Sequence, residues 1–251
     1  MITIATYNIL HGYYKNEILD NIKFLIGKNA DVICLQEADI PFEEHLNKFL
    51  LDFSNWSVRY FHSGKGSNLA VMWNTKKLEL THVEAILLPK PSDDTPRQRA
   101  AQVATFTTEG KTLRVSNVHL AWEGGVSHRF VQLQYLKKIL SQSDCEHEII
   151  VGDFNTFAPA MFRNIQKRKA QKTLGDGWKN ALPDLVWTCD VSRSFKQDNF
   201  HLFSTALKRL GFKLRSCLDY VFIKNLRVIK GEMLDLPGSD HRPLLVSLTV
   251  E

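Results

Sequence analysis

The chain has 251 residues, of which 44% are hydrophobic and 24% are charged, and these proportions are typical of globular proteins. A chain of this length buries a sizeable core without disulfides or a structural metal, and its four cysteines form no C-x-x-C pair of the kind that binds zinc. The net charge of +5 favours partners that carry phosphate. No apolar stretch reaches the roughly 18 residues of a membrane span, and the first residues lack a signal-peptide pattern. We therefore expect a cytoplasmic protein without stable membrane insertion.

Segments with strand and helix periodicity alternate from one end of the chain to the other. The segments with strand patterns are residues 2–7, 32–35, 58–61, 69–73, 78–87, 102–107, 113–119, 149–151, 218–223 and 244–250. Apolar residues recur at helical spacing in 18–26, 42–50 and 133–140. The last of these helices is expected to begin near Ser127, which could be its N-cap.

The alternation of strand and helix patterns is not interrupted by internal repeats, low-complexity tracts or Gly/Ser-rich linkers. The proline-rich segment 89–96 is expected to be a loop and not a domain boundary, because strand patterns continue on both sides of it. We expect residues 1–251 to form a single domain in which two sheets pack face to face and helices cover the outer faces.

Polar residues interrupt the apolar runs at or next to strand ends. They are Asn8, Glu37, His119, Asp153, Asn155, Asp219, Asp240 and His241. Each has a structural explanation when taken alone, as a turn former, a turn cap, an Asx-turn or a hydrogen-bonded core histidine. Together they would form a costly polar cluster unless the cluster binds something.

The chemistry of this set suits a metal ion and a water molecule. A glutamate such as Glu37 supplies the hard oxygen ligand that Mg²⁺ prefers, and an aspartate such as Asp153 can orient and deprotonate water. Asparagine amides and histidine can donate hydrogen bonds to phosphoryl oxygens. Because no thiol or hydroxyl is clearly placed as a nucleophile, the set favours direct attack by water.

Six motifs built on these residues resemble those of the endonuclease/exonuclease/phosphatase superfamily, and they occur in the family's order. The motifs are Thr6-Tyr7-Asn8-Ile9, Leu35-Gln36-Glu37, Asn117-Val118-His119-Leu120, Gly152-Asp153-Phe154-Asn155, Leu218-Asp219-Tyr220-Val221-Phe222 and Ser239-Asp240-His241-Arg242-Pro243. The resemblance covers essentially the whole chain. It implies a four-layer α/β-sandwich of two mostly antiparallel sheets flanked by helices, with a divalent-metal site that usually takes Mg²⁺ or Mn²⁺.

The resemblance also assigns expected roles. Glu37 would be the principal metal ligand, with Asn8 contacting the metal-bound water or phosphate and Asp240 supporting the metal directly or through water. Asp153 would activate the attacking water, and Asn155 would bind a phosphoryl oxygen. Asp219 would orient His241, which would contact the scissile phosphate.

The sequence departs from the family's pattern in one place. His119 would stabilise developing charge or assist the leaving group, but Ala100 stands where pancreatic-type deoxyribonucleases have the glutamate that pairs with this histidine. This replacement argues against a strong general-acid role for His119. Arg99, next to it, is similar to the bacterial members and could contact phosphate, or it could be an exposed arginine at the start of a strand. Arg129 and Gln132 look like family residues that support the fold.

The substrate is less well defined by the sequence. The basic run 167–172 could hold a nucleic-acid backbone or form a solvated helix face, and Trp122 and Tyr13 could stack on a base or simply pack. The leading hypothesis is a monomeric Mg²⁺-dependent phosphodiester hydrolase that acts on a phosphate ester, with nucleic acid the first substrate to test. Alternatives are a lipid or small-molecule phosphate hydrolase with the same site, and a catalytically silent binding module on the same fold.

Overall fold

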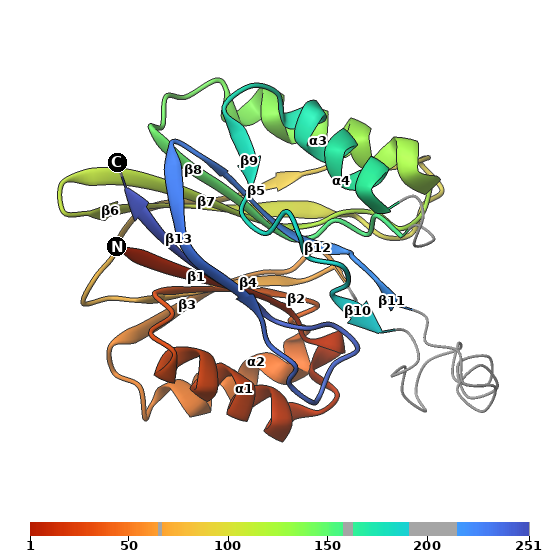
Figure 1. Cartoon of the computed structure of the whole chain (residues 1–251). Coiled ribbons are helices and arrows are strands. Elements are labelled where there is room, and N and C mark those ends of the chain that lie inside the picture. Colours follow the sequence, from red (N-terminus) through yellow and green to blue (C-terminus); the bar gives the residue numbers. More distant parts are fainter. Residues whose placement is uncertain (65–66, 158–162, 191–214, 251) are drawn as a thin grey trace.

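Two six-stranded β-sheets form the centre of the structure, a computed structural model that describes residues 1–64, 67–157, 163–190 and 215–250 (Figure 1). The first sheet has, in spatial order, β13 (Leu226–Met233), β14 (Leu244–Val250), β1 (Ile2–Asn8), β2 (Val32–Gln36), β4 (Leu69–Asn74) and β3 (Trp56–Phe61). The second has β5 (Glu79–Leu87), β6 (Ala100–Thr108), β7 (Lys111–His119), β8 (His147–Asp153), β12 (Asp219–Lys224) and β9 (Trp178–Asn180). A short pair, β10 (Cys189–Asp190) and β11 (Arg215–Ser216), lies beside them.

Helices cover the outer face of each sheet (Figure 1). The first sheet carries α1 (Lys15–Gly27) and α2 (Ile40–Leu50), preceded by the 3₁₀ turn η1 (Leu10–Gly12). The second carries α3 (Gly125–Leu140) and α4 (Arg163–Leu174). Each large sheet has one parallel strand pair, β1 with β2 and β7 with β8, and its other pairs are antiparallel. The predicted four-layer α/β-sandwich is therefore confirmed. None of the described helices is both long enough and apolar enough to cross a membrane.

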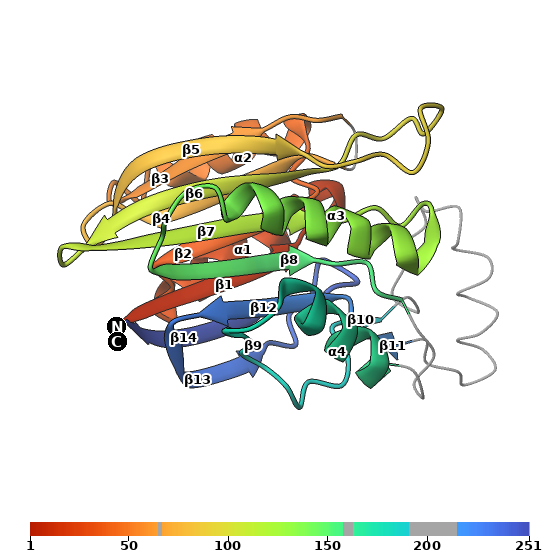
Figure 2. The ribbon, with the colours of Figure 1, turned by 90° about the horizontal axis from the view of Figure 1, so that it is seen from above.

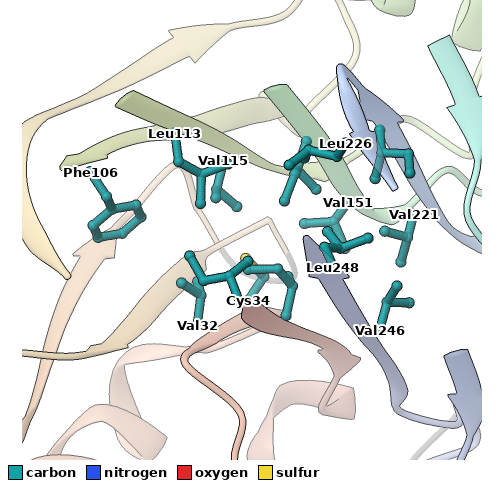
Figure 3. Packing of buried hydrophobic residues seen from close by; sticks show 14 of the residues in the cluster. Val32, Cys34, Phe106, Leu113, Val115, Val151, Val221, Leu226, Val246 and Leu248 are labelled. Atoms are coloured by element: carbon teal, nitrogen blue, oxygen red, sulfur yellow. The ribbon is translucent and has the colours of Figure 1, made fainter. Parts of the chain in front are cut away.

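The main hydrophobic core lies between the two sheets. Val32 and Cys34 of β2 face Val115 of β7 and Val151 of β8 across this layer (Figure 3). Alternate residues of the same strands face outward and pack under the helices, as Ile33 does in the first sheet and Ile150 in the second. This period-2 burial on both faces is why the central strands read as nearly continuous apolar runs in the sequence.

Some elements differ from the sequence predictions. Helix α3 begins at Gly125 with Gly124 as its N-cap, so the prediction of Ser127 as N-cap was wrong. Gly124 adopts a left-handed conformation (φ 74°), and a Cβ there would meet the Pro91 ring at 2.7 Å, so the tight turn requires glycine. Strand β13 was not predicted, because it is an edge strand with one buried residue, and its exposed residues interrupt the apolar alternation.

Gly152 allows β7 and β8 to lie side by side close to the polar strand ends. Its φ is 137°, and a Cβ at this position would lie 2.1 Å from the backbone oxygen of Val118. We expect Gly152→Ala to lower the free energy of unfolding by well over the ~1 kcal/mol that an unsuitable backbone conformation alone costs, because the backbone must move. Urea unfolding measures this loss. The matched control is Gly110→Ala, which has φ 75° but nothing within 4 Å, and an equal loss in both variants would contradict the role of the close approach.

Candidate active site

The inward-facing side chains of the central strands change from apolar to polar at one end of the sandwich. In β1, Ile2 and Ile4 belong to the core, and Asn8 on the same face ends the strand. In β8, Val151 is a core residue and Asp153 ends the strand. Parallel strands bring their carboxyl ends to the same edge of a sheet, which is where α/β proteins commonly bind ligands. Figure 2 shows both chain termini at the opposite end of the sandwich.

The register of the strands brings the predicted residues together. His119 ends β7 directly opposite Asp153, and Asp219 begins the antiparallel strand β12 on the other side of Asp153. In the first sheet, Asn8 ends β1 opposite Gln36, the residue that precedes Glu37. The sites on the two sheets meet because Asn8 Nδ2 donates a hydrogen bond to Asp153 Oδ2 at 3.0 Å.

Asp153 is the centre of this cluster and is 2% exposed. Its Oδ2 atom lies 3.6 Å from His119 Nε2 and 3.8 Å from His241 Nε2. Burial raises the pKa of the Asp153 carboxyl to about 7, although the charge of His241 acts in the opposite direction. A carboxylate whose pKa lies near neutral pH is suited to accept a proton from water. The Asx-turn expected for this residue is also present, since Asn155 N donates to Asp153 Oδ1 at 2.7 Å.

Asp219 and His241 form a buried pair. Asp219 Oδ2 lies 2.8 Å from His241 Nδ1, and this contact leaves Nε2 of His241 directed toward Asp153. Burial alone would lower the pKa of His241, but the nearby Asp219, Cys189 and Asp153 raise it well above its ordinary value. The imidazolium form is therefore favoured, with a fixed ring orientation. The Ser239 hydroxyl supports the pair, because it accepts a hydrogen bond from the His241 backbone and donates one to the Asn8 carbonyl.

Glu37 lies in a left-handed conformation (φ 58°) directly after β2, and His11 of η1 has the same φ. His11 Nε2 lies 3.1 Å from Glu37 Oε2, and His11 Nδ1 lies 2.8 Å from Asp39 Oδ2. Asp39 is the N-cap of α2, but its carboxylate does not cap the helix and instead accepts a hydrogen bond from Asn68 Nδ2 at 2.9 Å. Strained non-glycine residues around one carboxylate are typical of functional sites.

The Glu37 carboxylate fits a divalent cation. Oε2 is buried and accepts no aligned hydrogen bond from the described part of the chain, and Oε1 accepts a long one of 3.3 Å from Asn8 Nδ2. An ionised carboxylate in this state is costly unless a cation or water satisfies it. The imidazole of His11 is held by Asp39 and contacts Glu37. It is therefore arranged like the residues that contact a metal ligand without binding the metal and fix the ligand's orientation. His11 and Asp39 could not be predicted as site residues from the sequence, because their significance depends on contacts between separate loops.

We expect His11→Ala to weaken the affinity of the metal-free protein for Mn²⁺ by about 10- to 100-fold, which is the usual cost of removing a residue that orients a metal ligand. Titration calorimetry measures the affinity directly. The control is His62→Ala, which removes a comparable contact, because His62 Nε2 lies 3.0 Å from the Glu43 carboxylate in α2. Unchanged affinity in His11→Ala would show that Glu37 does not need this support.

His119 is buried against Arg99. Arg99 Nη1 lies 3.1 Å from His119 Nδ1 and 3.0 Å from Nε2, so it is not bonded to one ring nitrogen selectively. Arg99 is 2% exposed and also contacts Glu123, at 3.6 Å, which makes the alternative of an exposed arginine wrong. Burial lowers the pKa of His119 well below its ordinary value, and the charge of Arg99 lowers it further. The neutral form is therefore favoured, which agrees with the doubt that Ala100 raised about a general-acid role.

The two remaining predicted residues lie at the rim of the cluster. Asn155 has φ 50°, and its Nδ2 donates to the Leu120 carbonyl at 2.9 Å, so the side chain is anchored beside His119. Asp240 is half-buried, and its carboxylate lies within 4.8 Å of ligand atoms of both Cys189 and His241.

Several supporting residues also have defined positions. Arg129 Nε donates to the Ala121 carbonyl and Gln132 Oε1 accepts from Ala121 N, which agrees with the fold-supporting role expected of both. The basic residues 167–172 of α4 do not all share one environment, so neither a solvated helix face nor a surface for a nucleic-acid backbone describes the whole run. Lys167 is buried and donates to the carbonyls of Pro183 and Leu185, whereas Arg168 lines an open pocket of ≈ 480 Å³.

The fold agrees with comparisons to known proteins. The sequence model of the endonuclease/exonuclease/phosphatase family matches residues 5–241, so the chain belongs to this family. A UPF0294 protein of Vibrio campbellii is 25% identical over 236 residues, which are 88% of this chain and 69% of that protein. A UPF0294 protein of Vibrio vulnificus is 26% identical over 237 residues, with 90% and 69% coverage.

Solved structures of low sequence identity share the fold. An endonuclease/exonuclease/phosphatase from Bacteroides vulgatus has a TM-score of 0.75 at 18% identity and covers 100% of this chain and 99% of its own. A mannosyl-6-phosphatase from Bacteroides thetaiotaomicron has a TM-score of 0.72 at 14% identity, with coverage of 99% and 100%. TDP2 from D. rerio, complexed with a single-stranded DNA product, has a TM-score of 0.71 at 18% identity, with coverage of 99% and 98%.

Family membership establishes the class of chemistry. Members of this family are metal-dependent phosphoric ester hydrolases, and the chain is an enzyme of that class. The family depends on a divalent metal and acts on phosphate esters.

Proposed function

We propose that the chain is a Mg²⁺-dependent phosphodiester hydrolase and that nucleic acid is its substrate. The observation that carries this proposal is the position of the Asp153 carboxylate. It is buried between two histidines, linked to Glu37 through Asn8, and its pKa is raised to about 7 by burial. A base of this kind, next to a carboxylate that needs a cation, suits direct attack by water on phosphorus.

The residues of the site would have separate roles in binding the metal, the water and the phosphate. Glu37 would hold the cation, with Asn8 and Asp240 holding water near it, and bound Mg²⁺ would offset the negative charge of the phosphoryl oxygens. Asp153 would orient the attacking water and accept its proton at Oδ2. His241, with Asp219 at Nδ1, would donate a hydrogen bond from Nε2 to a phosphoryl oxygen.

The other polar groups would bind the phosphoryl group. Asn155, anchored to the Leu120 carbonyl, would contact a second phosphoryl oxygen. Arg99 would add a fixed positive charge beside neutral His119.

Two exposed aromatic side chains support a nucleic-acid substrate. Trp122 is 55% exposed and precedes Glu123, which contacts Arg99 in the site. Tyr13 is 42% exposed, and its ring lies 5.0 Å from the ring of His11. Exposed aromatic side chains near a phosphate site can stack on bases, which is worth about 1–3 kcal/mol per base. The TDP2 structure with a single-stranded DNA product makes single-stranded DNA the first polymer to test.

A small-molecule phosphate hydrolase is the second candidate. Arg99 favours it, because a buried guanidinium beside the site suits the extra charge of a terminal phosphate monoester. The mannosyl-6-phosphatase of Bacteroides thetaiotaomicron has the same fold and gives a sugar phosphate as a test compound.

The test is a substrate panel assayed with Mg²⁺, comprising single- and double-stranded DNA, RNA, a phosphodiester lipid headgroup, an inositol phosphate and a sugar 6-phosphate. We expect single-stranded nucleic acid to give the highest kcat/KM, and Trp122→Ala to raise KM for it without affecting a small diester. Faster turnover of a headgroup or a monoester would overturn the nuclease assignment. Absence of turnover for every compound, with Mg²⁺ still bound, would favour a silent binding module.

A further inference from the structure

Cys189 is the first residue of β10 and forms an isolated β-bridge with His241. Cys189 is 2% exposed, so its thiol is buried against His241. Ligand atoms of Cys189, Asp240 and His241 all lie within 4.8 Å of one another. The proposed hydrolysis does not use this thiol.

A thiol, a carboxylate and an imidazole form a ligand set typical of Zn²⁺, which takes sulfur, nitrogen and oxygen ligands in tetrahedral sites. Mg²⁺ requires oxygen ligands at octahedral positions and does not compete for sulfur. The site is also supported from behind, because Asp219 holds His241 Nδ1 at 2.8 Å and leaves Nε2 available. A carboxylate on the far nitrogen is the usual partner of a histidine that binds zinc.

We propose that Cys189, Asp240 and His241 form a second metal site, which binds Zn²⁺ or a similar thiophilic cation and inhibits the enzyme. The cation enters from the side of Asp240, the half-buried member of the set. On binding, the Cys189 thiol and the Nε2 atom of the His241 imidazolium each lose a proton to solvent, and the cation forms bonds to the sulfur and to Nε2. Three protein ligands leave one tetrahedral position for water.

Inhibition follows from the shared histidine. His241 cannot bind Zn²⁺ through Nε2 and donate a hydrogen bond to a phosphoryl oxygen from the same atom. This part rests on the proposed function, whereas metal binding at Cys189 does not. The first measurement therefore detects binding without any substrate.

The first experiment titrates the metal-free protein with Co²⁺, a spectroscopic substitute for Zn²⁺, in the presence of excess Mg²⁺. We expect a near-ultraviolet thiolate-to-cobalt absorption band in the wild type, and no such band in Cys189→Ser or Cys189→Ala. Cys145→Ser is the matched control, because Cys145 is partly exposed and contacts His147, away from this cluster, and the band should persist. Asp240→Asn should keep the sulfur band but weaken binding.

The second measurement is the Zn²⁺ affinity of each variant by competition with a chelating dye. Replacing Cys189 should weaken the Zn²⁺ affinity at least ~10-fold. Removing a residue that only orients a metal ligand already lowers metal affinity by about 10- to 100-fold. Circular dichroism checks that both Cys189 variants fold. Because serine is polar and alanine is apolar, a loss of affinity in both variants reflects the missing sulfur. A cobalt–sulfur band that survives in both variants, or is missing from the wild type, would overturn the site.

The third measurement is Zn²⁺ inhibition of hydrolysis, expressed relative to each variant's own Mg²⁺-supported rate. The Cys189 variants should require at least ~10-fold more Zn²⁺ for the same inhibition, in parallel with their affinity. Equal sensitivity in wild type and Cys189→Ser would mean that Zn²⁺ acts at Glu37 and would contradict the inhibitory role. A chain that hydrolyses nothing but shows the band would retain the metal site and lose only the proposed function.

Discussion

Asp153→Asn is expected to lower kcat for a phosphodiester by about 10²- to 10⁴-fold, the range that a positioned general base contributes. The amide has nearly the same shape, and its single oxygen can still accept the hydrogen bond from the backbone of Asn155, but its NH₂ group then faces Asn8 Nδ2 and cannot take a proton from water. KM should change little, because Asp153 contacts the water and not the substrate. Steady-state kinetics with Mg²⁺ measures both constants, and Asp235→Asn, an exposed carboxylate paired with Arg242, is the control.

Asp153→Asn should also change how the free energy of unfolding depends on pH. Burial raises the pKa of Asp153 from the ordinary value of 3.8 to about 7, so the folded state binds a proton that the unfolded state releases. The contribution of this group to the free energy of unfolding is therefore present at low pH and is lost as pH rises from about 4 through about 7. Metal-free Asp153→Asn should lose this pH dependence and be relatively more stable than wild type at pH 8. Equal pH profiles for the two proteins would contradict the raised pKa.

Asp219→Asn is expected to lower kcat/KM by about 10²- to 10⁴-fold, because His241 loses the carboxylate that fixes its Nδ1 proton and its charge. The asparagine can still contact Nδ1, so the fold should be preserved. In the variant, burial remains and the largest opposing charge is removed, so the pKa of His241 should fall. NMR titration of the His241 ring measures this fall, and an unchanged pKa would contradict the role of the pair.

The sign of the accompanying stability change follows from the raised pKa of His241. The favoured imidazolium stabilises the folded protein at pH values below the ordinary pKa of histidine, 6.5, and this contribution is lost as pH rises through the folded-state value. Wild type should therefore exceed Asp219→Asn in free energy of unfolding most clearly at acidic pH, with the difference narrowing at alkaline pH. Urea unfolding at several pH values measures the difference.

The central strands could be predicted from the sequence because they are buried on both faces. Ile33 and Cys34, for example, are both 0% exposed although they point to opposite sides of β2, so the strand appears as an unbroken apolar run. The edge strand β13 lacks this signal, since only its first residue is buried and the strand has a register shift between Val228 and Lys230. The helix α4 was ambiguous because its pattern is dominated by charge.

The candidate site was predictable where a polar residue ends an apolar strand. Asp153 and His119 carry this signal, and the strand register then brings them into contact. His11 and Asp39 lie in loops without a distinctive pattern, and only the folded chain brings them to Glu37. Arg99 was recognised as a candidate, but its burial depends on packing against His119 and Glu123, which no local pattern encodes.

The most direct test of a metal-dependent hydrolase built around Glu37 is a Mg²⁺ titration of the EDTA-treated protein, with hydrolysis of a model phosphodiester as the readout. Wild type should show no activity before Mg²⁺ is added and full activity after it. Glu37→Gln should need at least ~10-fold more Mg²⁺, because the amide replaces the ionised ligand. Activity that survives EDTA, or an identical Mg²⁺ dependence in wild type and Glu37→Gln, would contradict this account.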